Sequence, residues 1–101
     1  MGKINIGING FGRIGRTVFR LLSEHEDLNV VAINDLADAK TLAHLVKYDS
    51  IHGPFAKEIL AKKDTILFNG KAITVLNHEH PKDIQWSEHK VDLVIEATGR
   101  F

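Results

Sequence analysis

Cysteine is absent from this chain of 101 residues. Its absence excludes disulfides, thiolate metal sites and a cysteine nucleophile within the chain. No apolar run approaches the roughly 20 residues that a helix needs to span a bilayer. The N-terminus also lacks the basic region, apolar stretch and small-residue cleavage site that are typical of a secretion signal. We therefore expect a soluble, cytoplasmic protein.

The charges of the chain cancel, because 13 basic and 13 acidic side chains give a formal net charge of zero. No net field attracts a polyanion or an anionic membrane surface, so we expect neither nucleic acid nor a membrane among its partners. With 44% hydrophobic residues, the chain is long enough for one small domain with a core. No repeat, low-complexity tract or linker interrupts it, which predicts one domain or part of one.

Apolar patterns in the first half of the chain alternate between strand and helix. Residues 3–9 alternate in polarity and are rich in isoleucine, and residues 29–35 form a second apolar, β-branched run. Both segments predict buried strands. Helices are predicted between and after them, over 13–23 and 38–47. This order favours an α/β fold with a parallel sheet.

The two predicted helices are each supported by apolar residues at helical spacing. In the first helix these residues are Ile14, Val18, Leu21 and Leu22, with Arg16 and Arg20 between them. In the second helix the residues that share a face are Ala39, Leu42, Ala43 and Val46. Asp38 precedes the second helix and is expected to cap it.

A hairpin is predicted in the second half of the chain. Residues 57–61 and 65–68 have the composition of short strands, and Asn69-Gly70 joins the second of them to an apolar run over 71–76. Asn-Gly between apolar runs is the strongest short hairpin signal, because both residues tolerate positive φ.

Three further segments complete the prediction. Gly53-Pro54 indicates a loop over 48–55, and residues 80–86 are expected to be irregular or to form a single helical turn. The run over 91–99 predicts another apolar strand that ends in a glycine turn.

A glycine motif, Gly10-x-Gly12-x-x-Gly15, lies between the first strand and the first helix. Gly10 allows the tight turn off the strand, Gly12 lets the backbone approach a bulky anion, and Gly15 permits close packing of helix on strand. The helix then directs unpaired N–H groups and the positive end of its dipole at that anion. The motif therefore predicts a site for the pyrophosphate of a dinucleotide.

Asp35 ends the second predicted strand, 20 residues after Gly15. An acidic side chain at this spacing accepts hydrogen bonds from both ribose hydroxyls of an adenosine and repels a 2′-phosphate, which favours NAD over NADP. The alternative interpretation is that Asp35 is a turn or cap residue before the next helix.

Other polar residues support weaker interpretations. His78-Glu79-His80 suggests a metal site, but spacing positions no further ligand, so we expect surface histidines and no metal. Phe11 is expected to pack under the glycine turn. Trp86 is expected to cover the edge of the core, with stacking on adenine as a less supported alternative.

Taken together, the motifs resemble one family, the phosphorylating, NAD-dependent glyceraldehyde-3-phosphate dehydrogenases. The matching blocks are INGFGRIGR (8–16), AIND (32–35), KYDSIHGPF (47–55), NGKAI (69–73) and EATGRF (96–101). They occur in the order and spacing of the family over essentially the whole chain, so the resemblance is specific.

The resemblance implies a Rossmann-like, doubly wound cofactor domain of a homotetrameric glycolytic enzyme. It implies that the backbone at Arg13 and Ile14 holds the pyrophosphate of NAD and that Asp35 holds the adenosine ribose. Thr98 and Gly99 would lie beside the cofactor, and the segment from Tyr48 to Phe55 would help to form subunit contacts. The implied cofactor-binding residues are Gly10, Gly12, Arg13, Ile14, Gly15, Asp35, Glu79, Thr98 and Gly99.

One departure from the family affects the adenine site. The family often has Glu-Arg-Asp-Pro where this chain has His78-Glu79-His80-Pro81. A main-chain contact from Glu79 to adenine is compatible with this change, whereas a contribution from an arginine side chain is not.

The resemblance also implies what residues 1–101 do not supply. In the family, a cysteine thiolate attacks the aldehyde, a histidine acts as its base, and arginines bind phosphate; all belong to later segments. We therefore expect residues 1–101 to be the N-terminal part of the NAD-binding domain. The catalytic domain would be absent and the chain alone inactive, with no catalytic residue of its own.

The expected sheet is incomplete, with about four parallel strands plus a hairpin. Taking 71–76 as the third parallel strand, the predicted spatial order is third, second, first, fourth. The strand over 91–96 would then be an unprotected edge, which predicts marginal stability or self-association. Two alternatives to the main interpretation are a free-standing, non-catalytic NAD-binding module and the matching segment of an erythrose-4-phosphate dehydrogenase.

Overall fold

The computed structural model of the chain describes residues 3–25, 27–48, 59–68 and 71–98. Its elements, in chain order, are β1 (Ile4–Asn9), α1 (Arg13–Ser23), β2 (Leu28–Asn34), α2 (Ala39–Tyr48), β3 (Ile59–Lys62), β4 (Thr65–Phe68), β5 (Lys71–Leu76), the 3₁₀ turns η1 (Pro81–Asp83) and η2 (Trp86–His89), and β6 (Leu93–Glu96). None of the helices in these residues is long and apolar enough to cross a membrane.

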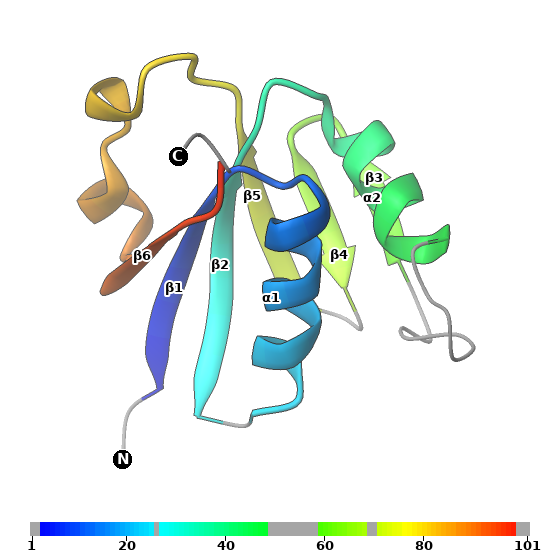
Figure 1. The fold of residues 1–101 in the computed structure, drawn as a ribbon, viewed down its shortest axis with the longest axis horizontal. Coiled ribbons are helices and arrows are strands. Elements are labelled where there is room, and N and C mark those ends of the chain that lie inside the picture. The colour runs from blue at the N-terminus through cyan, green and yellow to red at the C-terminus, as the bar shows by residue number, and fades with distance from the viewer. Residues whose placement is uncertain (1–2, 26, 49–58, 69–70, 99–101) are drawn as a thin grey trace.

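The strands form one six-stranded sheet in the order β3-β4-β5-β2-β1-β6 (Figure 1). The four strands β5, β2, β1 and β6 are parallel, and β3 and β4 add an antiparallel meander at one edge. This confirms the incomplete Rossmann-like fold and the predicted spatial order. Asn69 and Gly70, where the turn is predicted, lie outside the described residues, but Phe68 pairs with Lys71, as a hairpin requires.

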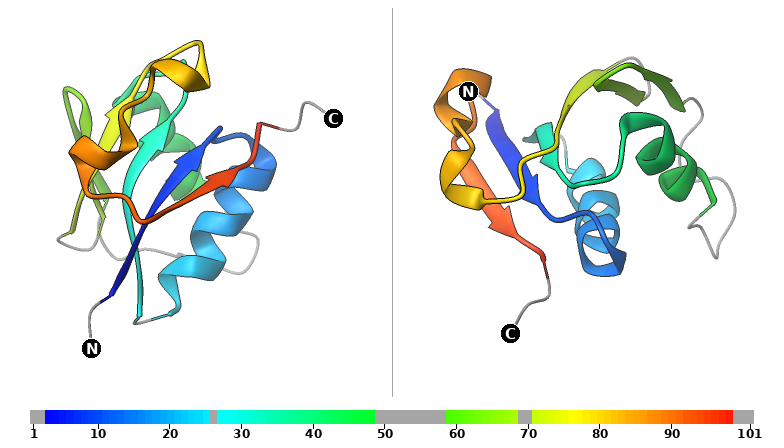
Figure 2. Two further views of the ribbon diagram at one scale, coloured as in Figure 1. Left: turned by 90° about the vertical axis from the view of Figure 1, so that its left-hand side faces the viewer. Right: turned by 90° about the horizontal axis from the view of Figure 1, so that it is seen from above.

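Helices α1 and α2 lie on one face of the curved sheet, and η1 and η2 lie on the other (Figure 2). The connections between parallel strands change from one face of the sheet to the other after β5. Up to that point the chain moves outward from β1 to β2 and β5, and it then returns across the sheet to β6. The turn expected within 80–86 is η1, whereas η2 was not predicted. Residues 49–58, which include most of the expected loop, lie outside the described part of the chain.

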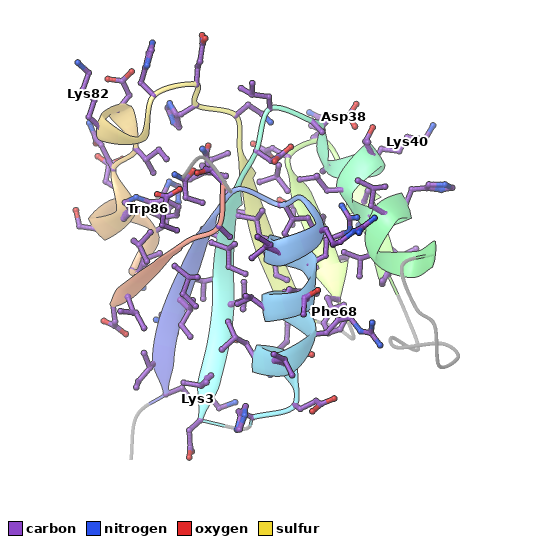
Figure 3. The ribbon with its side chains drawn as sticks, viewed as in Figure 1. Lys3, Asp38, Lys40, Phe68, Lys82 and Trp86 are labelled. Atoms are coloured by element: carbon purple, nitrogen blue, oxygen red, sulfur yellow. The ribbon has the colours of Figure 1, made fainter. Side chains whose placement is uncertain are left out.

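Three aromatic rings connect α1 to the sheet. Phe19, on the buried face of α1, makes edge contacts with Phe11, at a centroid distance of 5.7 Å, and with Phe68, at 4.9 Å. Phe68, labelled beside α1 in Figure 3, belongs to β4 and so connects this helix to the sheet. Phe11 is fully buried, which confirms that it packs under the glycine turn.

The face that α1 buries coincides only in part with the predicted apolar face: Val18 and Leu22 are half-buried, and Leu22 packs against the core. Ile14 is 58% exposed and Leu21 is 57% exposed, whereas Gly15 and Phe19 are buried. The helix is rotated in this way because Gly15 allows it to approach the glycine turn closely, which brings Phe19 over the sheet. Ile14 lies in the first turn of α1, next to the glycine turn, and its side chain is exposed.

Helix α2 has the predicted face and the predicted cap. Its residues Ala39, Leu42, Ala43 and Val46 are all buried. Asp38 Oδ1 accepts a hydrogen bond of 2.8 Å from the backbone N–H of Thr41, as an N-cap does. Figure 3 shows Asp38 at the start of the helix. Hydrogen bonds from the Thr41 side chain and backbone lower the pKa of Asp38 from its ordinary value of 3.8.

We expect the cap at Asp38 to make stability depend on acid. Because the folded-state pKa is lowered, the ionised carboxylate stabilises the fold above pH 3.8, and this contribution is lost as the pH falls through the folded-state value. Asp38→Asn keeps a capping oxygen but does not titrate. The wild-type Tm should exceed that of Asp38→Asn near neutral pH, and the difference should vanish in acid. A constant difference across thermal scans at descending pH would contradict this.

The opposite edge of the sheet is formed by β6, which pairs only with β1 among the described strands. Leu93 and Val94 are exposed along it. On the face away from α1, the half-buried Trp86 ring packs over Gly7 of β1, where an added Cβ would lie 2.6 Å from Trp86 Cε3. Trp86 thus covers the edge of the core as predicted, and marginal stability or self-association stays a prediction.

Candidate functional site

A cleft of about 560 Å³ opens at the carboxyl ends of β1, β2 and β6. This is where parallel α/β sheets bind ligands, at the point where the strand order reverses. The volume is within the range of small-molecule and cofactor sites. The described residues that line it are Asn9, Gly10, Phe11, Gly12, Asn34, Asp35, Leu36, His78, Glu79, Glu96, Ala97 and Thr98.

Gly10 makes the turn from β1 into the cleft. Its φ is +96°, a conformation that side chains with a Cβ rarely adopt. An added Cβ would also lie 2.9 Å from backbone atoms of Ala97 and Thr98. The Gly10 N–H donates a 2.8 Å hydrogen bond to the carbonyl of Asn34. The turn is thereby attached to β2 and packs directly against the segment after β6.

Gly12 and Gly15 occupy different environments, although both belong to the motif. A Cβ on Gly15 would collide with the carbonyl oxygen of Gly10, so Gly15 is what lets α1 approach the turn. A Cβ on Gly12 would meet no heavy atom of the described residues within 4 Å. Gly12 lines the cleft, so this open space is available to a ligand.

Helix α1 begins immediately after Gly12, which is its N-cap residue. Among the described residues no side chain caps this end, and its first turn contains no acidic residue. Arg13 and Ile14, at the first two positions, are exposed. The N-terminus of α1 therefore combines a positive dipole end with accessible backbone donors, which is an arrangement that attracts an anion.

The glycine turn is held by hydrogen bonds at Phe11. Its N–H donates to Asp35 Oδ1 at 3.0 Å, and its carbonyl accepts from Arg16 Nη1 at 3.3 Å. Asp35 Oδ2 accepts from the N–H of Ala37 at 3.0 Å. Asp35 thus links the glycine turn to the turn after β2, which is the structural role that the sequence left open. Each carboxylate oxygen has a second lone pair, so this role is compatible with binding a ribose hydroxyl.

A buried polar network crosses the floor of the cleft, and sequence reasoning did not identify it. Asn9 and Asn34 are only 3% and 4% exposed. Asn34 Nδ2 donates to Asn9 Oδ1 at 2.8 Å, and Asn9 Nδ2 donates to both carboxylate oxygens of Glu96, at 3.1 and 2.9 Å. The available signal was an asparagine at the last position of two apolar strands, where a core residue would otherwise be expected.

The same network fixes the wall of the cleft after β5. Asn34 pairs with the backbone of His78, donating to its carbonyl at 3.0 Å and accepting from its N–H at 2.9 Å. Asn77 Nδ2 donates to the carbonyls of Asp35, at 2.8 Å, and Ala37, at 2.9 Å. These four hydrogen bonds hold the segment that leads to Glu79 against the turn that carries Asp35.

The structure therefore brings most of the predicted residues to one place. Gly10, Gly12, Asp35, Glu79 and Thr98 line the cleft. Gly15 lies behind the turn, Arg13 and Ile14 begin the adjoining helix, and Gly99 lies outside the described residues. His78 and His80 are exposed, as expected, and no group of three metal-ligating side chains gathers within the described residues.

Comparisons with known proteins agree with this geometry. The family model described as "Glyceraldehyde 3-phosphate dehydrogenase, NAD binding domain" matches residues 4–101. Three similar relatives are glyceraldehyde-3-phosphate dehydrogenases: from Bacillus subtilis, 50% identical over 98% of this chain; from Geobacillus stearothermophilus, 51% over 97%; and from Mycoplasma pneumoniae, 49% over 97%. The chain covers 29% of the length of each. With the family model spanning nearly every residue, the chain belongs to the glyceraldehyde-3-phosphate dehydrogenase family, in its NAD-binding domain.

Proposed function

We propose that this cleft binds NAD and that the chain serves as the cofactor-binding segment of a phosphorylating glyceraldehyde-3-phosphate dehydrogenase. That enzyme would oxidise and phosphorylate glyceraldehyde 3-phosphate to 1,3-bisphosphoglycerate, with hydride transfer to NAD. The observation that carries the proposal is the convergence of the glycine turn, the N-terminus of α1 and Asp35 on one cleft. Membership of the family supports the same cofactor.

The pyrophosphate of NAD fits the open space at Gly12. The backbone N–H groups of Arg13 and Ile14 would hold it, helped by the dipole of α1, and Gly10 and Gly15 would maintain the turn that lets it approach. Of the described residues that line the cleft, none is a lysine or an arginine. The pyrophosphate would therefore depend mainly on backbone donors.

The remaining parts of NAD are assigned to the walls of the cleft. Asp35 would accept hydrogen bonds from the adenosine ribose, and the main chain at Glu79 would contact adenine. Thr98, with Gly99 after it, would lie beside the cofactor on the other side of Gly10. Bound NAD supplies the hydride acceptor, while the residues of this chain bind and orient it.

Several properties of the whole enzyme follow as proposals. The catalytic residues and the sugar-phosphate site would be supplied from outside residues 1–101, so this chain alone would not oxidise the aldehyde. The enzyme would be a cytoplasmic homotetramer that acts in glycolysis. The relatives described above carry the name glyceraldehyde-3-phosphate dehydrogenase, which does not favour the erythrose-4-phosphate enzyme or a free-standing module.

Titration of NAD into the chain, followed by amide chemical shifts, tests the proposal. Saturable shifts should occur around 10–15. In Asp35→Asn the affinity should fall roughly tenfold, because a charged acceptor of the ribose hydroxyls is lost. Asp27→Asn is the matched control, since it makes the same charge change at the opposite end of β2. Equal affinity in both variants would contradict the role of Asp35.

Gly12→Ala separates binding from folding in the same titration. Its methyl group would project into open space rather than into protein, so it should obstruct the pyrophosphate without disturbing the turn. NAD shifts that persist unweakened in this variant would show that the ligand does not approach the glycine turn.

A further inference from the structure

Carboxylates dominate the charge of the cleft. Asp35, Glu79 and Glu96 all line it, and His78 is the remaining titratable side chain among the described lining residues. Asp35 accepts two backbone N–H groups, and both oxygens of Glu96 accept from Asn9. Glu79 is exposed at the wall of the cleft, as is Glu96, whereas Asp35 is half-buried.

The backbone that carries Glu79 is fixed close to Asp35. Asn77, two residues before Glu79, donates to the carbonyl of Asp35 at 2.8 Å. His78, the residue between them, is held at both its N–H and its carbonyl by Asn34, the neighbour of Asp35 in sequence. Glu79 therefore extends from a restrained segment at the Asp35 end of the cleft.

We propose that Glu79 is a second specificity-determining residue, which acts with Asp35 to exclude a dinucleotide that carries a 2′-phosphate. The inference rests on the proposed NAD site, in which the adenosine ribose lies at Asp35. A phosphate monoester carries between about −1.5 and −2 charges near neutral pH, so it would face two carboxylates. Among the described lining residues no lysine or arginine is available to compensate them.

If Glu79 repels the 2′-phosphate, replacing it should change the affinity for NADP relative to the affinity for NAD. In Glu79→Gln, the affinity for NADP relative to NAD should rise roughly fivefold to tenfold, because the substitution removes a negative charge that repels the 2′-phosphate, a group that only NADP carries. Glu79→Lys should raise the ratio further. Amide-shift titrations of the chain with NAD and with NADP give both affinities.

Two controls distinguish electrostatic exclusion from an altered fold. Glu24→Gln removes one carboxylate at the C-terminal end of α1, away from the cleft, and should leave the ratio unchanged. The effect of Glu79→Gln should largely disappear in 1 M salt, where the screening length falls from about 10 Å at 0.1 M to about 3 Å.

The outcomes separate this inference from the proposed function. NAD binding with the same ratio in wild type, Glu79→Gln and Glu79→Lys would overturn the role of Glu79 and leave the NAD site standing. A raised ratio that persists in 1 M salt would overturn electrostatic exclusion. Absence of NAD binding to the wild-type chain would overturn both.

Discussion

Gly15→Ala is expected to destabilise the fold by about 2–4 kcal/mol, because the new methyl group has no space. It would be placed against the carbonyl oxygen of Gly10 and 3.1 Å from the carbonyl carbon. These are backbone atoms, which cannot rotate away as the end of a side chain can. Alanine has a better helix propensity than glycine by up to about 1 kcal/mol, which is too little to offset the collision.

Gly10 cannot retreat to relieve the collision. Its N–H is bonded to the carbonyl of Asn34, and on its other side it approaches the backbone of Ala97 and Thr98. Displacing α1 instead would pull Phe19 away from Phe11 and Phe68. Either response gives up native packing, so the loss should appear in the free energy of unfolding itself.

Urea denaturation followed by far-UV circular dichroism measures the loss, and Gly12→Ala is the matched control. Gly12 has a φ of −79°, which alanine adopts, and an added Cβ there meets nothing. Replacing an N-cap glycine by alanine should therefore cost less than about 1 kcal/mol. Equal unfolding free energies for the two variants would show that the close approach of α1 to the turn is not what Gly15 provides.

This contrast shows how far the glycine motif could be interpreted from the sequence. Its spacing indicated a turn, a close approach and a helix start, and the structure has all three. The sequence did not show which face of α1, the helix that follows, is turned toward the sheet. The period of Ile14, Val18, Leu21 and Leu22 predicted a helix correctly, but the close contact at Gly15 selects a buried face that includes Leu22 and leaves Ile14 and Leu21 exposed.

The floor and one wall of the cleft were harder to predict for another reason. Asn9 and Asn34 are separated by 25 residues, and their pairing depends on the parallel register of β1 and β2. The order of the strands was predictable from the pattern and the resemblance, whereas a hydrogen bond between two amides requires the register itself. The tie between Asn34 and the His78 backbone depends, in addition, on the path of the chain after β5.

The network also explains how a cleft open to solvent keeps a defined shape. Most of its contacts are made by side chains to backbone groups of the turns, so the positions of Phe11, His78 and Asp35 depend on one another. The recognising groups proposed for NAD are largely backbone groups on these same turns. In these segments, side chains therefore hold the turns in place, while backbone groups of the same turns are the groups proposed to bind NAD.

Asn34→Leu is the second substitution for which we expect a large effect, a loss of about 3 kcal/mol in the free energy of unfolding. Leucine has the same branched shape but cannot form hydrogen bonds. It would leave Asn9 Oδ1 without its donor and the N–H and carbonyl of His78 without the partners they have at 2.9 and 3.0 Å. Each buried polar group left unsatisfied costs about 1–3 kcal/mol.

The same change should loosen the wall that carries Glu79, since it removes both hydrogen bonds that hold the His78 backbone and leaves those of Asn77 and of the Leu76 carbonyl before it. Amide hydrogen exchange at His78 and Glu79 should accelerate more than at the β1–β2 ladder, and NAD affinity should fall with it. Asn29→Leu, on the same strand, is the control, because Asn29 is half-buried and makes one long hydrogen bond of 3.4 Å to Asn5. If both variants lose the same stability, or if exchange at His78 does not change, Asn34 does not position the wall.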